Sequence, residues 1–171
     1  KIAFLAYNTI LPRGYWADID RPGSNPLRAF TFYEQVEHDQ PGTPCRIHTF
    51  PHKDDLDAMR NSIVKAKEKA DIVIVSMHFG IHFIPAVIAD YQREVAHTAI
   101  DCGADLILGH HAHILKGIEV YAGKVIFYSL CNFAYELTAT KEEIESPRRK
   151  EIAHLNPDWV PDPEYPHYFL P

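Results

Sequence analysis

Three histidines lie within four positions of the segment DLILGHHAHILKG, residues 105–117: His110, His111 and His113. They directly follow a run of apolar residues that is typical of a buried strand. Neutral imidazole is the commonest protein ligand of Zn²⁺ and also binds Mn²⁺ and Fe. The segment therefore predicts metal binding or acid–base chemistry at the point where a strand ends and a loop begins.

Two further histidines follow another apolar run. The segment DIVIVSMHFGIH, residues 71–82, carries His78 and His82 after its β-branched stretch. In open α/β sheets, ligands gather at the carboxyl ends of parallel strands, so the two histidine-bearing loops are expected to converge. Gly80 and Gly109 permit the close backbone approach or positive φ that a crowded site needs.

The spacing inside the second loop predicts different roles for its histidines. In extended backbone, residues i and i+2 point the same way, so His111 and His113 are expected to approach one metal centre or two adjacent ones. His110 is then expected to point to the other side. Three adjacent imidazoles would repel one another when protonated, which favours a metal site over ordinary core packing.

Oxygen ligands for such a site are scarce in this chain. Metal-assisted hydrolysis usually needs a carboxylate or amide ligand, often one that bridges two metals. Asp71 and Asp105 open their predicted strands and so lie at the opposite edge of the sheet. Asp54 and Asp55 stand at a helix start, where they can act as caps. Glu119 is the best remaining candidate, so the sequence predicts only half of a metal site.

The elements that position these loops are predicted from hydrophobic periodicity. Apolar residues at steps of three and four predict two amphipathic helices, residues 52–70 and 86–102. Apolar runs and turn signals predict strands at 1–7, 46–50, 71–80 and 105–108, and a hairpin around Ala122-Gly123. Strand, helix and strand in that order make a parallel βαβ unit, so the sequence predicts an α/β fold.

Proline divides the chain into regions. Prolines concentrate in residues 1–51 and from Pro147 onward, which predicts that regular structure concentrates between them. We expect residues 1–146 to form one domain that includes a long Pro/Gly-rich loop region at 8–55. The tail, 147–171, is expected to wrap over the surface rather than to form a strand.

The bulk composition excludes several classes of function. The net charge is −6 without a basic stripe, which excludes nucleic acid as a partner. No apolar run reaches the roughly 20 residues that span a bilayer. Cys45, Cys102 and Cys131 are too few and too scattered for a disulfide framework, and we expect them to be buried as small hydrophobes. The chain begins at Lys1 without a methionine, so the missing signal sequence says little about location.

Several segments resemble the CapA-type capsule-synthesis (poly-gamma-glutamate synthesis) proteins of the calcineurin-like metallophosphoesterase superfamily. The segments KIAFLAY, DIVIVSMHFG and DCGADLILGHHAHILKGIEVYAGKVIFYSLCNF are similar to the C-terminal half of that family. The resemblance covers roughly residues 1–7 and 56–135. Its most specific part is a GHHxH segment followed by a YSLxNF segment.

The resemblance implies a four-layer α/β/β/α sandwich with a site for two divalent transition metals, which are Zn, Mn or Fe. It places the metal-binding histidines at His78, His111 and His113. The family's aspartate and Asn-His motifs lie upstream of Lys1, so the remaining ligands are expected there. The resemblance also implies an extracytoplasmic, membrane-associated protein, although no signal or anchor lies in this chain.

Two positions depart from the family pattern. His82 stands where the family commonly has an acidic residue, and we expect it either to contact substrate or metal or to serve in packing. Cys131 replaces the glycine of a Ser-Leu-Gly-Asn-Phe segment. That replacement weakens the case for a close backbone approach at this turn.

Three functions are compatible with these patterns. The first is a metal-dependent hydrolase for a phosphate-like or acyl substrate, in which His110 is a catalytic residue that supports a ligand or contacts substrate, while Tyr128 and Asn132 line the pocket. The second is a non-catalytic accessory protein that binds an anionic polymer in capsule or polyglutamate assembly, although a net charge of −6 opposes direct binding. The third, a structural zinc site, has the least support because such sites are usually rich in cysteine. The identity of the substrate and the oligomeric state do not follow from the sequence.

Overall fold

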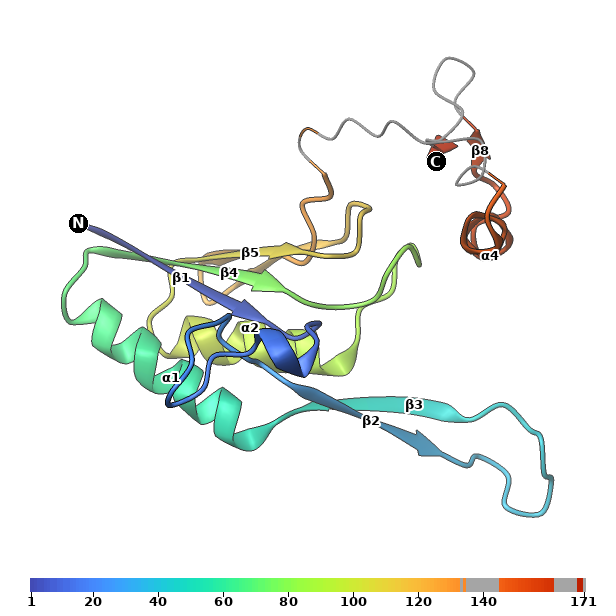
Figure 1. Cartoon of the computed structure of the whole chain (residues 1–171), viewed down its shortest axis with the longest axis horizontal. Coiled ribbons are helices and arrows are strands. Elements are labelled where there is room, and N and C mark those ends of the chain that lie inside the picture. The colour runs from blue at the N-terminus through green and yellow to red at the C-terminus, as the bar shows by residue number, and fades with distance from the viewer. Residues whose placement is uncertain (133, 135–144, 162–168, 171) are drawn as a thin grey trace.

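The computed structural model describes residues 1–132, 134, 145–161, 169 and 170 (Figure 1). In chain order its elements are β1 (Ile2–Asn8), η1 (Arg13–Tyr15), β2 (Ala29–Glu34), β3 (Arg46–Pro51), α1 (Lys53–Lys67), β4 (Ile72–His78), α2 (Asp90–Asp101), β5 (Leu106–His110), β6 (Ile118–Tyr121), β7 (Lys124–Phe127), α4 (Pro147–Leu155), β8 (Val160–Pro161) and β9 (Phe169–Leu170). The parts of the predicted domain at 133 and 135–144, and of the predicted tail at 162–168 and 171, lie outside the described residues.

Five strands form the central sheet, in the order β1-β4-β5-β7-β6. The first four run parallel to one another, and β6 pairs antiparallel with β7. The unit β4–α2–β5 is the predicted βαβ crossover. Ala122 and Gly123 join β6 to β7 with φ of 49° and 74°, and positive φ at both central positions is typical of a type I′ hairpin turn. The predicted α/β class, the βαβ unit and the hairpin are therefore confirmed.

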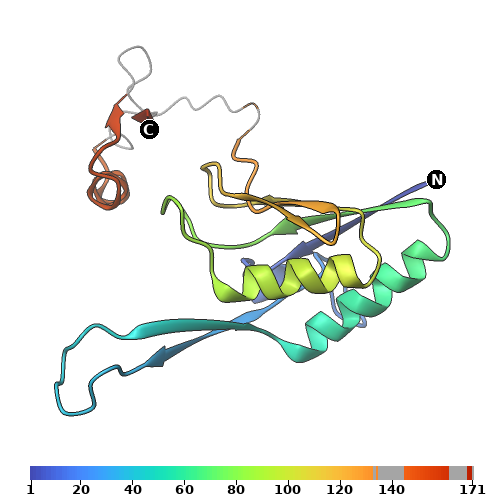
Figure 2. The same cartoon turned by 180° about the vertical axis from the view of Figure 1, so that it is seen from behind.

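Both α1 and α2 lie on the same side of this sheet (Figures 1 and 2). Alternate strand residues point toward the helices, because successive side chains of a strand point to opposite faces. The resulting core contains fully buried side chains from both helices and from three strands: Met59, Ile63, Val95, Val73, Val75, Met77, Ile107 and Ile126. The apolar faces expected for the two helices thus form one layer of a single core.

The opposite face of the sheet is apolar and exposed. In β1, Ile2 and Phe4 are 67% and 61% exposed, and in β6 Ile118 and Val120 are 65% and 70% exposed. Ile2 lies opposite Ile72 in the parallel register, so the exposed positions of neighbouring strands form continuous rows. Exposed apolar patches of this extent usually mark a surface that packs against something else.

The region predicted as a long loop, residues 8–55, contains a second, antiparallel sheet. β2 and β3 form a hairpin in which Ala29 lies opposite Pro51. β3 agrees with the strand predicted at 46–50, whereas β2 was not predicted. The β2 residues AFTFYE include adjacent aromatic side chains rather than strict alternation, so periodicity did not reveal this strand.

The start of α1 also differs from the prediction. Its N-cap residue is His52, which makes no side-chain capping bond. Asp55 instead accepts hydrogen bonds from Arg28, from Nε at 2.7 Å, from Nη2 at 2.5 Å and from the backbone N–H at 2.8 Å. The prediction that Asp54 or Asp55 caps the helix is therefore wrong, because both lie inside its first turn and Arg28 occupies the oxygens of Asp55. The pair ties the first turn of α1 to the residue that precedes β2.

The tail begins with a helix that the sequence did not predict. In α4, the Ser146 hydroxyl accepts a hydrogen bond from the backbone N–H of Arg149 at 3.3 Å, and Pro147 lies in the first turn. Proline is favoured at that position because its missing N–H is not needed there. Pro147, where regular structure was expected to end, therefore begins a helix. The expectation that the tail forms no strand is also wrong, because the two-residue strands β8 and β9 pair there. Among the described residues, no helix is long and apolar enough to cross a membrane.

All three cysteines are free. This agrees with the sequence, which predicted no disulfide framework. Cys102 and Cys131 are half-buried. Cys45 is exposed, in the loop before β3, so the expectation that it is buried is wrong. Free cysteines are usually buried when they lie in core elements, and Cys45 lies outside them.

Asp105 joins three elements at the amino edge of the sheet. One of its oxygens accepts hydrogen bonds from Lys67 Nζ at 2.7 Å and from the backbone N–H of Val73 at 2.9 Å. The other accepts a bond from Lys124 Nζ at 2.6 Å. Burial alone would raise the pKa of Asp105, but the bonds from Lys124, Lys67 and Val73 outweigh it and hold the pKa far below its ordinary value. The ionised carboxylate therefore links α1, β4 and β7 at the start of β5.

We predict that Asp105→Asn lowers the free energy of unfolding by about 2 kcal/mol near neutral pH, because it removes charge-assisted hydrogen bonds. The folded pKa is depressed, so this contribution is present above the unfolded pKa of about 4 and is lost as the pH falls below it. Denaturant unfolding of the wild type and the variant at several pH values measures the difference. Asp20→Asn, at an exposed position, is the matched control. A difference that stays constant between neutral pH and pH values well below 4 would contradict the assignment.

Candidate metal site

β4 and β5 end side by side, each on a histidine. Parallel pairing places His78 opposite His110, and the backbone N–H of Phe79 donates to the carbonyl oxygen of His110 at 3.1 Å. The preceding residues, Met77 and Gly109, are buried on the helix side. Both histidines therefore project onto the exposed face of the sheet, at its carboxyl edge. The two histidine-bearing loops converge, as the strand order predicted.

Three imidazole rings form a chain at this edge. His110 Nδ1 lies 2.8 Å from His78 Nδ1, and His78 Nε2 lies 3.1 Å from His111 Nδ1. The far nitrogen of His110, Nε2, lies 3.0 Å from the hydroxyl oxygen of Ser76. The expectation that His110 points away from the other histidines is therefore wrong. Strand β5 continues to His110, so its side chain follows the sheet alternation rather than that of the loop.

The turn after β5 is left-handed rather than extended. His111 and His113 have φ of 105° and 55°, in a region that non-glycine residues rarely adopt. The i, i+2 argument for a shared direction therefore does not apply to this backbone. The two rings are brought together through His82 instead, whose ring centroid lies 4.2 Å from that of His111 and 5.1 Å from that of His113.

His82 is the centre of this second group of rings. It stacks on His111 at an interplanar angle of 16° and on Phe83 at 22°. Its Nε2 is buried without a hydrogen-bond partner among the described residues. Burying a polar nitrogen without a hydrogen-bond partner costs free energy. His82 Nε2 is therefore available to a ligand, or to a group outside the described residues.

Asn132 fixes the ring of His113. The amide oxygen of Asn132 lies 2.7 Å from His113 Nδ1, so this nitrogen donates and Nε2 keeps its lone pair. The neighbouring residue, Cys131, has a φ of 60°. That conformation favours glycine, so Cys131 occupies a backbone position that residues with a side chain rarely adopt. The turn thus holds Asn132 against the histidines.

Burial favours the neutral form of most histidines of the site. Burial lowers the pKa of four of them below the ordinary value: His78, His82, His110 and His111. For His111 the shift is large, to a pKa of about 4, because the neighbouring imidazoles add to the effect of burial. Neutral imidazole is the form that binds metal ions, so the site needs no deprotonation near neutral pH.

The donor set fits a transition metal in part. Two imidazole nitrogens that bind one tetrahedral ion at about 2.0–2.1 Å lie roughly 3.3 Å apart, and the 3.1 Å between His78 Nε2 and His111 Nδ1 is close to this value. His113 Nε2 also keeps a lone pair, because its Nδ1 donates to Asn132. The described part of the chain has no group of three or more His, Cys, Asp or Glu side chains placed to hold an ion together. The histidines therefore fit as part of a ligand set that needs further donors.

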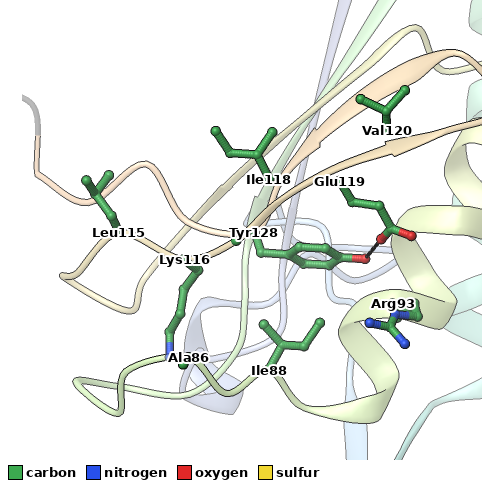
Figure 3. A pocket seen from close by; sticks show the side chains of 10 residues that line it. Ala86, Ile88, Arg93, Leu115, Lys116, Ile118, Glu119, Val120 and Tyr128 are labelled. Carbon is green, nitrogen blue, oxygen red and sulfur yellow. Dashed lines mark hydrogen bonds between the residues drawn. The ribbon is translucent and has the colours of Figure 1, made fainter.

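Two residues predicted for the site lie elsewhere. The Tyr128 hydroxyl donates to Glu119 Oε2 at 2.6 Å (Figure 3). His97 Nε2 lies 3.0 Å from Glu119 Oε1. Glu119 lies opposite the buried Ile126 in the β6–β7 register, so it projects toward α2, on the face opposite His78. Tyr128 and Glu119 line a separate pocket with a cavity volume of about 770 Å³ beside the exposed Arg93. Within the described part of the chain, neither residue has a hydrogen bond or ring contact with His78, His110 or His111.

The sequence did not single out two residues that shape the site. Lys116 is only 9% exposed, and its Nζ donates to the carbonyl oxygens of Ile84 and Val87, the latter at 2.8 Å. Its side chain points toward the loop that carries Ala86 and Ile88 (Figure 3). It thereby ties the loop after β5 to the loop that carries His82. Ser76 was also missed, although the alternation of β4 would have placed it on the face of His78.

Comparison with known proteins identifies a family that matches most of this chain. The family model described as bacterial capsule synthesis protein PGA_cap matches residues 1–136. The chain is similar to the PGA biosynthesis protein CapA of Bacillus subtilis, with 50% identity over 74 residues, which cover 43% of this chain and 19% of that protein. It is also similar to the capsule biosynthesis protein CapA of Bacillus anthracis, with 38% identity over 92 residues, or 50% of this chain and 22% of that protein.

A third relative has a different name. A probable polyglutamine synthesis accessory protein of Mycobacterium tuberculosis is 37% identical over 93 residues, which cover 54% of this chain and 24% of that protein. The matches thus span about a fifth to a quarter of the length of these curated relatives.

We predict that the imidazole of His111 titrates near pH 4 in the metal-free protein, well below the ordinary 6.5. Between these values the unfolded state binds more protons than the folded state, so the free energy of unfolding falls as the pH drops through this window. Ring-proton NMR against pH measures the titration, and denaturant unfolding measures the stability. His111→Gln should weaken the pH dependence of unfolding across the same window. Titration of His111 above pH 6 would contradict the burial of this ring.

Proposed function

The chain belongs to the PGA_cap family of bacterial capsule synthesis proteins, and on this premise we propose that it supplies the histidine half of the active site of a metal-dependent hydrolase of the metallophosphoesterase type. One observation carries the proposal. His78 Nε2 and His111 Nδ1 face each other at 3.1 Å, at the carboxyl edge of a parallel sheet. Both rings are neutral near pH 7, because burial lowers the pKa of each.

In this proposal His78 Nε2 and His111 Nδ1 hold one divalent ion, Zn, Mn or Fe, and His113 Nε2 holds the same ion or a second one. Such ions, when bound, lower the pKa of a coordinated water and neutralise charge on a phosphoryl or acyl group. Asn132 orients the ring of His113. His82, with its unpartnered Nε2, is placed to contact a substrate or a further ligand. The oxygen ligands come from outside the described residues.

His110 has a supporting role in this proposal. Both of its ring nitrogens are engaged, one by His78 at 2.8 Å and the other by Ser76 at 3.0 Å. In this arrangement both nitrogens face protein side chains, so neither is directed at a substrate. His110 therefore orients His78 rather than acting directly on substrate.

We also propose that the sheet is one half of a four-layer α/β/β/α sandwich. The helices cover one face, and the other face exposes rows of apolar side chains such as Phe4 and Val120. A second sheet is the layer that best matches an extended, twisted apolar surface. The histidine edge borders this face, so the added layer would bring its own loops close to the site.

A non-catalytic accessory role is the competing function. The Mycobacterium tuberculosis relative is named as a probable polyglutamine synthesis accessory protein. An anionic polymer would meet a net charge of −6 and neutral histidines here, so binding would depend on bound metal ions or on residues outside this chain. Metal-dependent turnover of a phosphodiester or acyl substrate separates the two functions.

We predict that the natural full-length protein binds a divalent transition metal and that His111→Ala removes most of it, because one of two facing nitrogens is lost. Inductively coupled plasma analysis after gel filtration measures the metal content. His38→Ala, at an exposed position in the β2–β3 loop, is the control and should retain the metal. No bound transition metal in the wild type, or unchanged metal content and turnover in His111→Ala, would refute the proposal.

The sandwich predicts a difference between two phenylalanines of equal exposure in this chain. Phe4 on the open sheet face is 61% exposed and Phe32 in the β2–β3 hairpin is 60% exposed. In the full-length protein, Phe4→Ser should lower the free energy of unfolding by about 2–3 kcal/mol, because a second sheet would bury this ring. Phe32→Ser is the matched control. A loss at Phe4 no greater than that at Phe32, measured by chemical denaturation, would argue against a covering layer.

A further inference from the structure

We propose that Ser76 is a positioning residue of the metal site, acting through His110 to hold His78 in its metal-binding form. The proposal rests on the proposed function, because it concerns the same ligand. It assigns a role to a side chain that touches neither the ion nor the substrate.

The strands place the three side chains in one row. Ser76 and His78 are two residues apart in β4, so both project onto the exposed face of the sheet. His78 lies opposite His110 in β5, and Ser76 lies opposite Leu108, two residues before it. The Ser76 hydroxyl oxygen is 3.0 Å from His110 Nε2, and His110 Nδ1 is 2.8 Å from His78 Nδ1.

The count of protons allows only one arrangement that leaves His78 able to bind metal. When His78 Nε2 offers its lone pair to an ion, the proton of the neutral ring is on Nδ1, which donates to His110 Nδ1. His110 Nδ1 is then an acceptor, so the proton of its neutral ring is on Nε2. That nitrogen donates to the oxygen of Ser76, which has lone pairs to accept it.

The opposite arrangement disables the ligand. If the Ser76 hydroxyl donates to His110 Nε2, then His110 Nδ1 carries the proton and donates to His78 Nδ1. His78 Nε2 is then protonated and can only donate, as it would to His111 Nδ1 at 3.1 Å. Binding of the ion therefore requires Ser76 to act as the acceptor, and its oxygen holds the ring of His110 in the orientation that the chain needs.

Outer hydrogen-bond partners of metal-binding histidines typically change metal affinity by about 10- to 100-fold when they are removed. In the full-length protein, we expect Ser76→Ala to weaken Zn²⁺ binding by roughly tenfold or more, as measured by competition with a chromophoric chelator. Ser76→Thr keeps the hydroxyl and should bind within a few fold of the wild type. Ser62→Ala, which removes a hydroxyl that donates to the Ala58 carbonyl oxygen within α1, is the control and should leave the Zn²⁺ affinity unchanged.

The visible absorption spectrum of the Co²⁺-substituted protein provides a second readout, because it reports ligand geometry. Ser76→Ala should shift this spectrum, and Ser76→Thr should restore it. Unchanged affinity and spectrum in Ser76→Ala, or equal losses in the Ala and Thr variants, would overturn the role of Ser76 while leaving the metal site intact. A wild type that binds no metal would instead overturn the proposed function, and the role of Ser76 with it.

Discussion

The parallel register of β4 and β5 is the constraint on which the rest of the site depends. It sets His78 opposite His110 at the last residue of each strand, on the face away from the helices. A shift of one residue would turn one of these rings toward the core and separate the pair. The contacts of Ser76 and His111 with this pair follow from the same register. The α2 crossover and the carboxylate of Asp105 at the opposite edge hold the strands in place.

Burial and shape make the cluster suited to metal binding. Burial lowers the pKa of His78 and of His111, which favours their neutral form, and His78 Nε2 faces His111 Nδ1 at 3.1 Å. The described residues contain no group of three or more His, Cys, Asp or Glu side chains placed to hold an ion. The adjoining sheet face also lacks a covering layer among the described residues, and its rows of apolar side chains are exposed to solvent. Both features lie at the same place in the fold. A layer that packs on the sheet face would therefore also be positioned to complete the ligand set, which connects the proposed sandwich with the proposed metal site.

Much of this arrangement could be predicted from sequence because it follows from strand ends. The apolar runs before His78 and His110 predicted parallel strands, and parallel strands deliver their following loops to one edge. The prediction that His111 and His113 point the same way assumes extended backbone, which this turn does not have. Their positive φ places both rings against His82, and no residue pattern signals a left-handed histidine as a glycine would.

Other parts of the site depend on contacts that spacing does not contain. Glu119 looked available as a ligand, yet His97 and Tyr128 occupy its oxygens on the opposite face of the sheet. No pattern in the sequence predicted a role for Lys116, whose ammonium group is buried against two carbonyl oxygens of a distant loop. Long-range side-chain partners of this kind are decided by tertiary packing, so a single sequence does not reveal them.

The central claim is that His78 and His111 share a metal ion. Anomalous diffraction from crystals of the full-length protein, recorded on both sides of the absorption edge of the bound metal, tests it most directly. The account predicts a peak at about 2.0–2.3 Å from both His78 Nε2 and His111 Nδ1. A peak held by other residues, or direct hydrogen bonding between these two rings in a protein saturated with metal, would contradict it.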